Sequence, residues 1–130
     1  RTTMRGAGLS DDLVEHGDFT ESGGEAAARL LLERAPDLDG IVAASDLMAA
    51  GALRVLAGSG RSVPGDVAVV GYDDVGVPER TTPQLTTVRN PIGEMAEQAV
   101  RLLLEQIDDQ RGPRPIRVIF PPALVRRDSA

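Results

Sequence analysis

A short, unbroken apolar run, Val67–Val70, lies near the middle of the chain and leads into Gly71-Tyr72-Asp73-Asp74. Pro64-Gly65-Asp66 predicts a turn before it, because proline fixes φ and glycine accepts a positive φ. A continuous apolar run, rather than an alternating one, predicts a strand covered on both faces, as in a parallel sheet. The two carboxylates then follow the carboxyl end of that strand, where open α/β sheets bind ligands.

Strand and helix patterns alternate along the rest of the chain. Short apolar runs predict further strands at Leu13–His16, Ile41–Ala44, Leu85–Val88 and Ile116–Phe120. Helices are predicted over about Gly23–Ala35, over Asp46–Ala57 and from Pro91 to a break at Gly112-Pro113, with the tail of another over Arg1–Ala7 that stops at Gly8. This alternation predicts an α/β fold with a mainly parallel sheet flanked by helices.

The predicted helices carry recognisable start signals. Ser22-Gly23-Gly24-Glu25 has the spacing of a capping box, and Ser45 precedes the second helix as an N-cap. Asn90 is the expected cap of the last helix, with Pro91 at its first position. Pro36 should end the first of these three helices.

Two of these helices differ in the distribution of their apolar residues. Asp46–Ala57 is apolar nearly all round, which implies a second buried face beyond the sheet, and we expect a partner subunit to cover it. The helix after Pro91 keeps a 3.6-residue period instead, so it should be amphipathic. Its apolar positions are Ile92, Met95, Ala96, Ala99, Leu103 and Ile107.

Composition excludes several classes of function. The chain has 130 residues, a net charge of −6 and no cysteine. An acidic balance argues against this segment binding a nucleic-acid backbone, and the lack of cysteine excludes disulfides, thiolate metal sites and a cysteine nucleophile. No apolar run approaches the ~20 residues that span a bilayer, and no signal peptide is recognisable at the start.

Four polar or aromatic residues follow the predicted carboxyl ends of strands: Phe19, Ser45, Asp73 and Asn90. That shared location predicts a single binding site. Each also has a structural interpretation. Phe19 could fill the core, Ser45 and Asn90 could be helix caps alone, and Asp73 could bond the following loop.

A catalytic site finds little support. Asp73 and Asp74 could suggest a metal or phosphoryl-acceptor site, but consecutive strand residues point to opposite faces. Neither a dinucleotide-binding nor a P-loop glycine motif is present. His16 is the single histidine, and no nucleophile elbow accompanies it. We expect no enzyme activity, metal or cofactor.

Six motifs then occur together in order: Gly17-Asp18-Phe19-Thr20, Ala44-Ser45-Asp46-Leu47-Met48-Ala49, Val63-Pro64-Gly65-Asp66-Val67, Val70-Gly71-Tyr72-Asp73-Asp74, Leu85-Thr86-Thr87-Val88-Arg89-Asn90-Pro91 and Pro122-Ala123-Leu124-Val125-Arg126-Arg127-Asp128-Ser129. Over essentially its whole length the chain resembles the C-terminal half of the LacI/GalR-family transcriptional regulators. The resemblance implies the C-terminal lobe of a type I periplasmic-binding-protein-like fold. It also implies that residues 1–130 are a partial effector-binding domain with its crossover segments, without the helix-turn-helix and most of the N-terminal lobe.

The resemblance also implies roles for individual residues. Phe19 matches an aromatic residue that stacks on the effector ring, and Ser45 and Asp73 match polar contacts to it. Asn90 lies where the chain crosses to the other lobe. Ser45 is shorter than the asparagine often found at its position. The effector would be a sugar or a purine-like molecule, and no membrane partner is implied.

The implied mechanism is an allosteric switch in the cytoplasm, in which effector binding changes how a dimer presents its DNA-binding heads to operator DNA. The homodimer would form through the helix Asp46–Ala57 and the loop Val75–Thr82. Without the helix-turn-helix, this segment should not bind operator DNA itself. The main alternative is a sugar-binding protein of a transport system, which shares the fold, and an enzyme is a more distant one.

Overall fold

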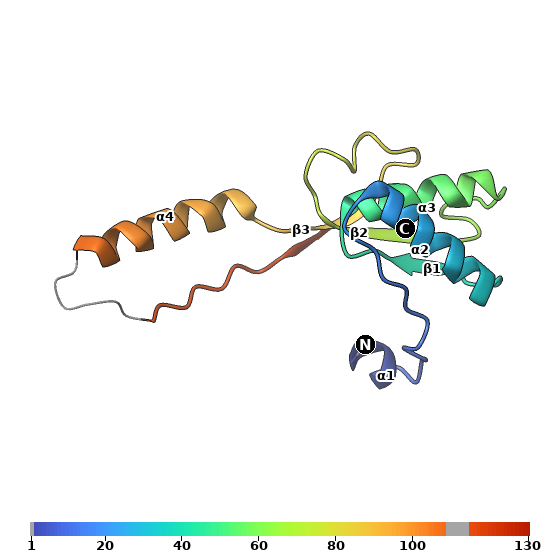
Figure 1. Ribbon diagram of the computed structural model, residues 1–130, viewed down its shortest axis with the longest axis horizontal. Coiled ribbons are helices and arrows are strands. Elements are labelled where there is room, and N and C mark those ends of the chain that lie inside the picture. Colours follow the sequence, from blue (N-terminus) through green and yellow to red (C-terminus); the bar gives the residue numbers. More distant parts are fainter. Residues whose placement is uncertain (1, 109–114) are drawn as a thin grey trace.

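The computed structural model describes residues 2–108 and 115–130 as a small α/β unit with a projecting arm (Figure 1). The elements are α1 (Thr2–Gly6), α2 (Glu21–Arg34), β1 (Gly40–Val42), α3 (Asp46–Gly58), β2 (Ala68–Asp73), β3 (Thr86–Arg89), α4 (Ile92–Asp108) and β4 (Ala123–Val125). The strands form one sheet in the order β1-β2-β3-β4. The first three are parallel and β4 is antiparallel to β3, which confirms the predicted mainly parallel α/β fold.

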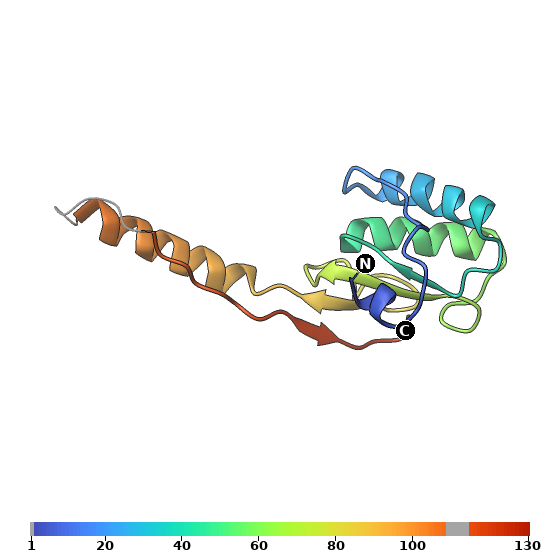
Figure 2. The same cartoon turned by 90° about the horizontal axis from the view of Figure 1, so that it is seen from below.

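The core lies between the sheet and two helices. Figure 2 shows α2 and α3 on one side of the sheet, one above the other. Val69 on β2 and Leu56 on α3 are fully buried, together with Val67 and Leu85, which directly precede β2 and β3. The other face of β2 is only half-buried, so the prediction that this strand is covered on both faces holds for one face alone.

Helix α2 begins earlier than the predicted capping box. Thr20, rather than Ser22, is its N-cap, and the Thr20 hydroxyl accepts the N–H of Gly23 at 3.0 Å. The prediction failed because two hydroxyl residues lie close together and the backbone becomes helical directly after Thr20. The helix ends at Arg34, ahead of Pro36 as predicted, and the N–H of Ala35 donates to the Leu31 carbonyl at 2.8 Å.

Helix α3 lies between the sheet and α2, which corrects one prediction. Its second buried face was assigned to a partner subunit, but α2 covers it. Gly24 and Gly51 permit this close approach, because a Cβ at Gly24 would collide with the backbone of Met48 and one at Gly51 with the carbonyl of Glu21. Leu47 is the large apolar residue of α3 that remains exposed, at 45%.

Two predicted strands are not strands in the structure. Leu13–His16 has no regular secondary structure: the N–H of Val14 donates to the Asp12 carbonyl at 3.0 Å, and the Val14 carbonyl accepts a hydrogen bond from Arg34 at 3.1 Å. Ile116–Phe120 runs away from the sheet, and pairing begins only after the two prolines, at Ala123. Both predictions rested on local apolar pattern, which does not show whether a partner strand is within reach.

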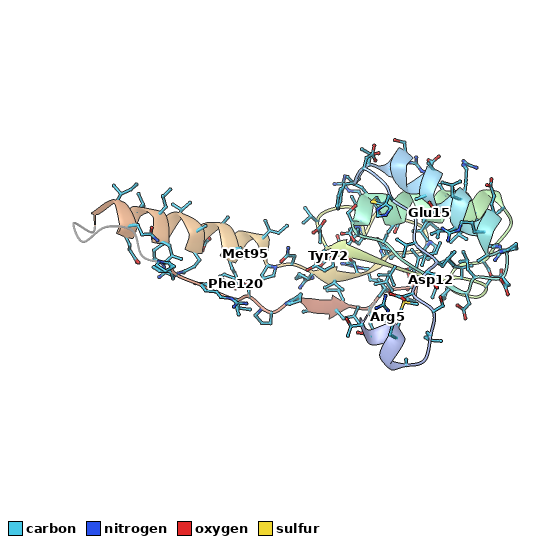
Figure 3. All side chains as sticks on the ribbon, turned by 60° about the horizontal axis from the view of Figure 1, so that its bottom comes forward. Arg5, Asp12, Glu15, Tyr72, Met95 and Phe120 are labelled. Carbon is cyan, nitrogen blue, oxygen red and sulfur yellow. The ribbon has the colours of Figure 1, made fainter. Side chains whose placement is uncertain are left out.

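Helix α4 projects from the α/β unit, and the segment that leads to β4 runs back beside it (Figures 1 and 2). Met95 lies on α4 and Phe120 on the returning segment (Figure 3). The predicted amphipathic pattern is present, but the apolar residues are exposed. They include Ile92, Met95, Val100, Leu103, Leu104 and Ile107 on the helix and Ile116, Val118 and Ile119 on the returning segment.

The end of α1 agrees with the sequence prediction, whereas the start of α4 does not. Helix α1 stops as predicted, with Gly8 at φ +73° and the N–H of Leu9 donating to the Met4 carbonyl at 2.9 Å. Helix α4 starts at Ile92 without a side-chain cap from Asn90 among the described contacts. The break predicted at Gly112-Pro113 lies outside the described residues, as does Arg1. Among the described residues, no helix is both long and apolar enough to cross a bilayer.

Candidate functional site

The carboxyl ends of β1, β2 and β3 meet at one edge of the sheet, because the three strands are parallel neighbours. Asp73 is paired in register with Arg89, and the next residue, Asn90, donates its N–H to the Asp73 carbonyl at 3.3 Å. Val42, the last residue of β1, pairs in register with Val70 of β2. Ser45 lies three residues after Val42, and Asp73 lies three residues after Val70, so the two occupy equivalent positions. The structure therefore brings Ser45, Asp73 and Asn90 to the same edge.

Asp73 is held in an unusual backbone conformation, with φ at +112°. Its carboxylate has no hydrogen bond or ion pair within the described part of the chain. Burial raises the pKa of Asp73 above its ordinary value, and the negative charge of Asp46 raises it further. This carboxylate can accept hydrogen bonds from hydroxyl or N–H groups of a ligand, which would then stabilise its charged form.

Asp74, the next residue, has a different environment. Its carboxylate is paired with Arg127 at 2.7 Å and with Arg89 at 2.7 Å, and its side chain is 4% exposed. Burial by itself would raise the pKa of Asp74, but hydrogen bonds and charge from the two arginines outweigh it and lower the pKa. The pair Asp73-Asp74 thus separates into a free carboxylate and an ion-paired one, as expected of consecutive residues with different directions.

Ser45 is 6% exposed and caps α3, as predicted, with its hydroxyl accepting the N–H of Met48 at 3.3 Å. The hydroxyl proton remains a potential donor. The structural interpretation of Ser45 as a cap is therefore confirmed. A contact between Ser45 and a ligand stays a prediction.

Phe19 lies in the turn before α2, with φ at +64° and 62% of its surface exposed. It is not a core residue, so that alternative is wrong. The turn is held by Asp18, whose carboxylate accepts the Thr20 hydroxyl at 2.6 Å, and this bond lowers the pKa of Asp18. Gly17 abuts the side chain of Met48, which places the turn beside the first turn of α3 and hence near Ser45.

Asp46 is a central residue that was not among the predicted site residues. It is 3% exposed, and its carboxylate accepts the N–H of Asp74 at 2.7 Å and the hydroxyl of Thr87 at 2.5 Å. It thereby joins α3 to the turn after β2 and to β3. The signal in the sequence was an acidic residue directly after a cap, but the long-range partners could not be found from it.

A groove lies between α3 and the loop after β2. It is lined by Leu47, Ala50, Arg54, Val77, Arg80 and Thr81, among others, and by none of the four predicted site residues. No group of three or more histidine, aspartate or glutamate residues that could hold a metal occurs among the described residues.

A model of the periplasmic binding protein-like domain family matches residues 1–130. The chain belongs to this family. Among curated relatives, the HTH-type transcriptional regulator CelR of Thermobifida fusca is 47% identical over 131 residues, which cover 99% of this chain and 38% of CelR. The predicted resemblance to LacI/GalR-type regulators is confirmed.

Solved structures of this periplasmic binding protein-like family agree with the fold. A transcriptional regulator CelR–cellobiose complex matches with a TM-score of 0.95 and 47% identity, covering 100% of this chain and 40% of that one. A LacI family transcriptional regulator from Arthrobacter sp. FB24, in complex with lactose, matches with a TM-score of 0.74 and 37% identity over 87% of this chain and 42% of its own. The chain spans about two fifths of the length of these proteins.

Proposed function

We propose that this chain forms one wall of the effector site in a LacI-type transcriptional regulator, which binds a small sugar and thereby controls its affinity for operator DNA. The observation that carries the proposal is the unpartnered Asp73 carboxylate at an edge shared with Ser45 and Asn90. A carboxylate with free acceptor positions suits the hydroxyl groups of a sugar, and the exposed ring of Phe19 suits its apolar face.

The relatives support a sugar over a purine. Cellobiose and lactose, the ligands of the two matched structures, are disaccharides. We therefore propose a disaccharide or a similar oligosaccharide as the effector, with Phe19, Ser45, Asp73 and Asn90 as its contacts on this lobe. A purine-like effector is the alternative, and ligand titration distinguishes the two.

A regulator is favoured over a transport protein because the matched relatives are named as transcriptional regulators. We propose that residues 1–130 are the C-terminal lobe of the effector domain with its crossover segments. Operator binding would come from a helix-turn-helix elsewhere in the intact protein, acting in the cytoplasm. A catalytic role is not part of this proposal.

We also propose a homodimer that involves α3 and the loop 75–82. The groove between them contains the exposed Leu47 and the charged residues Arg54 and Arg80. An exposed leucine within a polar border is a common composition for an interface. This use of α3 differs from the sequence prediction, since it involves the part of α3 that α2 leaves exposed.

The test is calorimetric titration of the intact gene product with cellobiose, with lactose and with a purine base. We expect heat of binding for at least one disaccharide and none for the purine. Asp73→Asn should raise the Kd about tenfold or more, because it removes a charged acceptor. Asp37→Asn, the same change at an exposed position in the turn before β1, should leave the Kd unchanged. Binding of the purine alone would exclude the sugar proposal.

A further inference from the structure

The turn that presents Asp73 is built on two consecutive residues with positive φ. Asp73 has φ +112° and Asp74 has φ +59°, and neither is glycine. Such conformations persist only where surrounding contacts hold them. The contacts that hold this turn therefore determine where the Asp73 carboxylate lies.

Two arginines hold the Asp74 side chain, and Asp46 holds the backbone of the turn. One carboxylate oxygen, Oδ2, accepts the N–H of Asp74 at 2.7 Å and that of Val75 at 3.3 Å, directly after Asp73 in the chain. The other, Oδ1, accepts the Thr87 hydroxyl at 2.5 Å. Because the backbone of Asp46 belongs to α3, its carboxylate connects the turn to that helix. Through Thr87 it also connects the turn to β3.

The surroundings of Asp46 leave room for this carboxylate. Gly71, on β2, faces it, and a Cβ at Gly71 would collide with Oδ1 of Asp46. Asp46 is 3% exposed and Thr87 is fully buried, so water does not compete for these bonds. A buried carboxylate with three donors from two other segments is a rigid support.

Asp46 also acts on Asp73 through its charge. The charged groups near Asp73 are Asp46 on α3, Asp74 next to it, Arg89 opposite it on β3, and Arg127 after β4. The charge of Asp74 is compensated by both arginines, each in an ion pair of 2.7 Å. Asp46 has no arginine partner among the described ion pairs, and its charge raises the pKa of Asp73.

We propose that Asp46 is the positioning residue of the effector site: its carboxylate fixes the Asp73-Asp74 turn so that the Asp73 carboxylate faces the effector. The inference rests on the proposed function for the identity of the effector. The support of the turn itself does not depend on it. Asp46 does not contact the effector in this proposal.

The test compares wild type with Asp46→Asn in the intact gene product. An asparagine keeps the shape but is neutral, so its hydrogen bonds to the turn lose the strength that the charged carboxylate gives them. We expect the Kd for the disaccharide that binds wild type to rise about tenfold or more. Amide hydrogen exchange at Asp74 and Val75 should accelerate. Asp37→Asn is the matched control and should change neither quantity.

A spectroscopic readout separates positioning from general loss of structure. In a carboxyl ¹³C titration, the pKa of Asp73 should fall in Asp46→Asn because a neighbouring negative charge is removed. A variant that merely loosened the core would accelerate amide exchange throughout the core and not chiefly at Asp74 and Val75. Wild-type affinity together with an unchanged Asp73 pKa and unchanged exchange in Asp46→Asn would overturn the inference.

Two further variants decide the question if Asp46→Asn does not fold. Thr87→Val removes one of the three donors to Asp46, and Thr87→Ser restores the hydroxyl. We expect weaker disaccharide binding in the first and recovery in the second, and equal affinities would contradict the proposal. If wild type binds no disaccharide, the proposed function fails, and the exchange and titration measurements alone decide whether Asp46 holds the turn.

Discussion

Arg127 and Asp74, 53 residues apart in the sequence, form an ion pair of 2.7 Å in which both side chains are largely buried. Arg127 also donates to the Leu85 carbonyl at 2.9 Å, so its guanidinium joins three segments. Asp74 in turn holds Arg89, the last residue of β3, before the chain leaves for α4. One carboxylate therefore fixes both the last residue of β3 and the segment that follows β4.

Removing Arg127 should destabilise the fold strongly. Arg127→Met leaves a buried charge on Asp74 with only the exposed Arg89 as partner, and we expect a loss of about 3 kcal/mol in the free energy of unfolding. Arg126→Met, next in the chain and exposed, should cost less than about 0.5 kcal/mol. Urea unfolding of both variants measures the difference, and similar losses would show that the ion pair does not support the fold.

The same ion pairs make stability depend on pH. The folded-state pKa of Asp74 lies below its unfolded value, so its contribution is fully present above the unfolded pKa of about 3.9. That contribution is lost as pH falls through the lower, folded-state pKa. Unfolding free energies measured from pH 7 to pH 2 should decline more steeply below pH 4 in wild type than in Asp74→Asn. The same pH dependence of the unfolding free energy in wild type and in Asp74→Asn would contradict the assignment of this effect to Asp74.

Asp73 should have the opposite effect on stability. Its folded-state pKa is raised by burial and by Asp46, so its contribution is favourable below the unfolded pKa and is lost as pH rises through the folded-state pKa. At pH 7 the charged carboxylate therefore disfavours the fold. Asp73→Asn should raise the Tm at pH 7 while it weakens disaccharide binding. A lower Tm would mean that Asp73 has a structural role, the alternative left open from the sequence.

The contact between α2 and α3 should tolerate no added methyl group. Gly24→Ala places a Cβ against the Met48 backbone, and we expect a loss of about 1 to 3 kcal/mol through overpacking. Gly58→Ala, in the last turn of α3, meets nothing within 4 Å and should stabilise the protein by up to ~1 kcal/mol. Thermal unfolding should therefore give a lower Tm for Gly24→Ala and a higher Tm for Gly58→Ala than for wild type. A neutral Gly24→Ala would show that the two helices can separate.

The proposed homodimer predicts a specific sensitivity at Leu47. Leu47→Glu introduces a charge beside the groove between α3 and the loop 75–82, and we expect the intact gene product to shift from dimer to monomer in light scattering. Leu30→Glu on α2 is the matched control, since Leu30 is also 45% exposed and lies outside that groove. A dimer that survives Leu47→Glu, or one lost equally in both variants, would refute the proposed interface.

Local sequence signals predicted those elements that are determined by residues close together in the sequence. Ser45 caps α3 and the apolar run at Val67–Val70 leads into β2, because capping and apolar runs act over a few residues. The edge that carries Ser45, Asp73 and Asn90 followed from the parallel order of the strands. The position of Phe19 on an exposed turn did not follow, since an aromatic residue fits a core equally well.

Long-range contacts account for the failures. The role of Asp46 depends on Thr87, 41 residues away, and no spacing in the sequence connects them. The packing of α2 on α3 depends on Gly24 and Gly51, and the need for glycine at these positions is apparent only when the two helices are adjacent. β4 lies at Ala123–Val125 rather than at the more apolar Ile116–Phe120, because pairing with β3 is set by the path of the returning chain.

The short joint between β3 and α4 has a mechanical consequence. Asn90 and Pro91 separate the last paired residue of the strand from a straight helix of 17 residues, about 25 Å long. A rotation of roughly 10° at that joint moves the far end of the helix by about 4 Å. Because the N–H of Asn90 also donates to the Asp73 carbonyl, a small rotation of the backbone at Asp73 would move the far end of α4 over a larger distance.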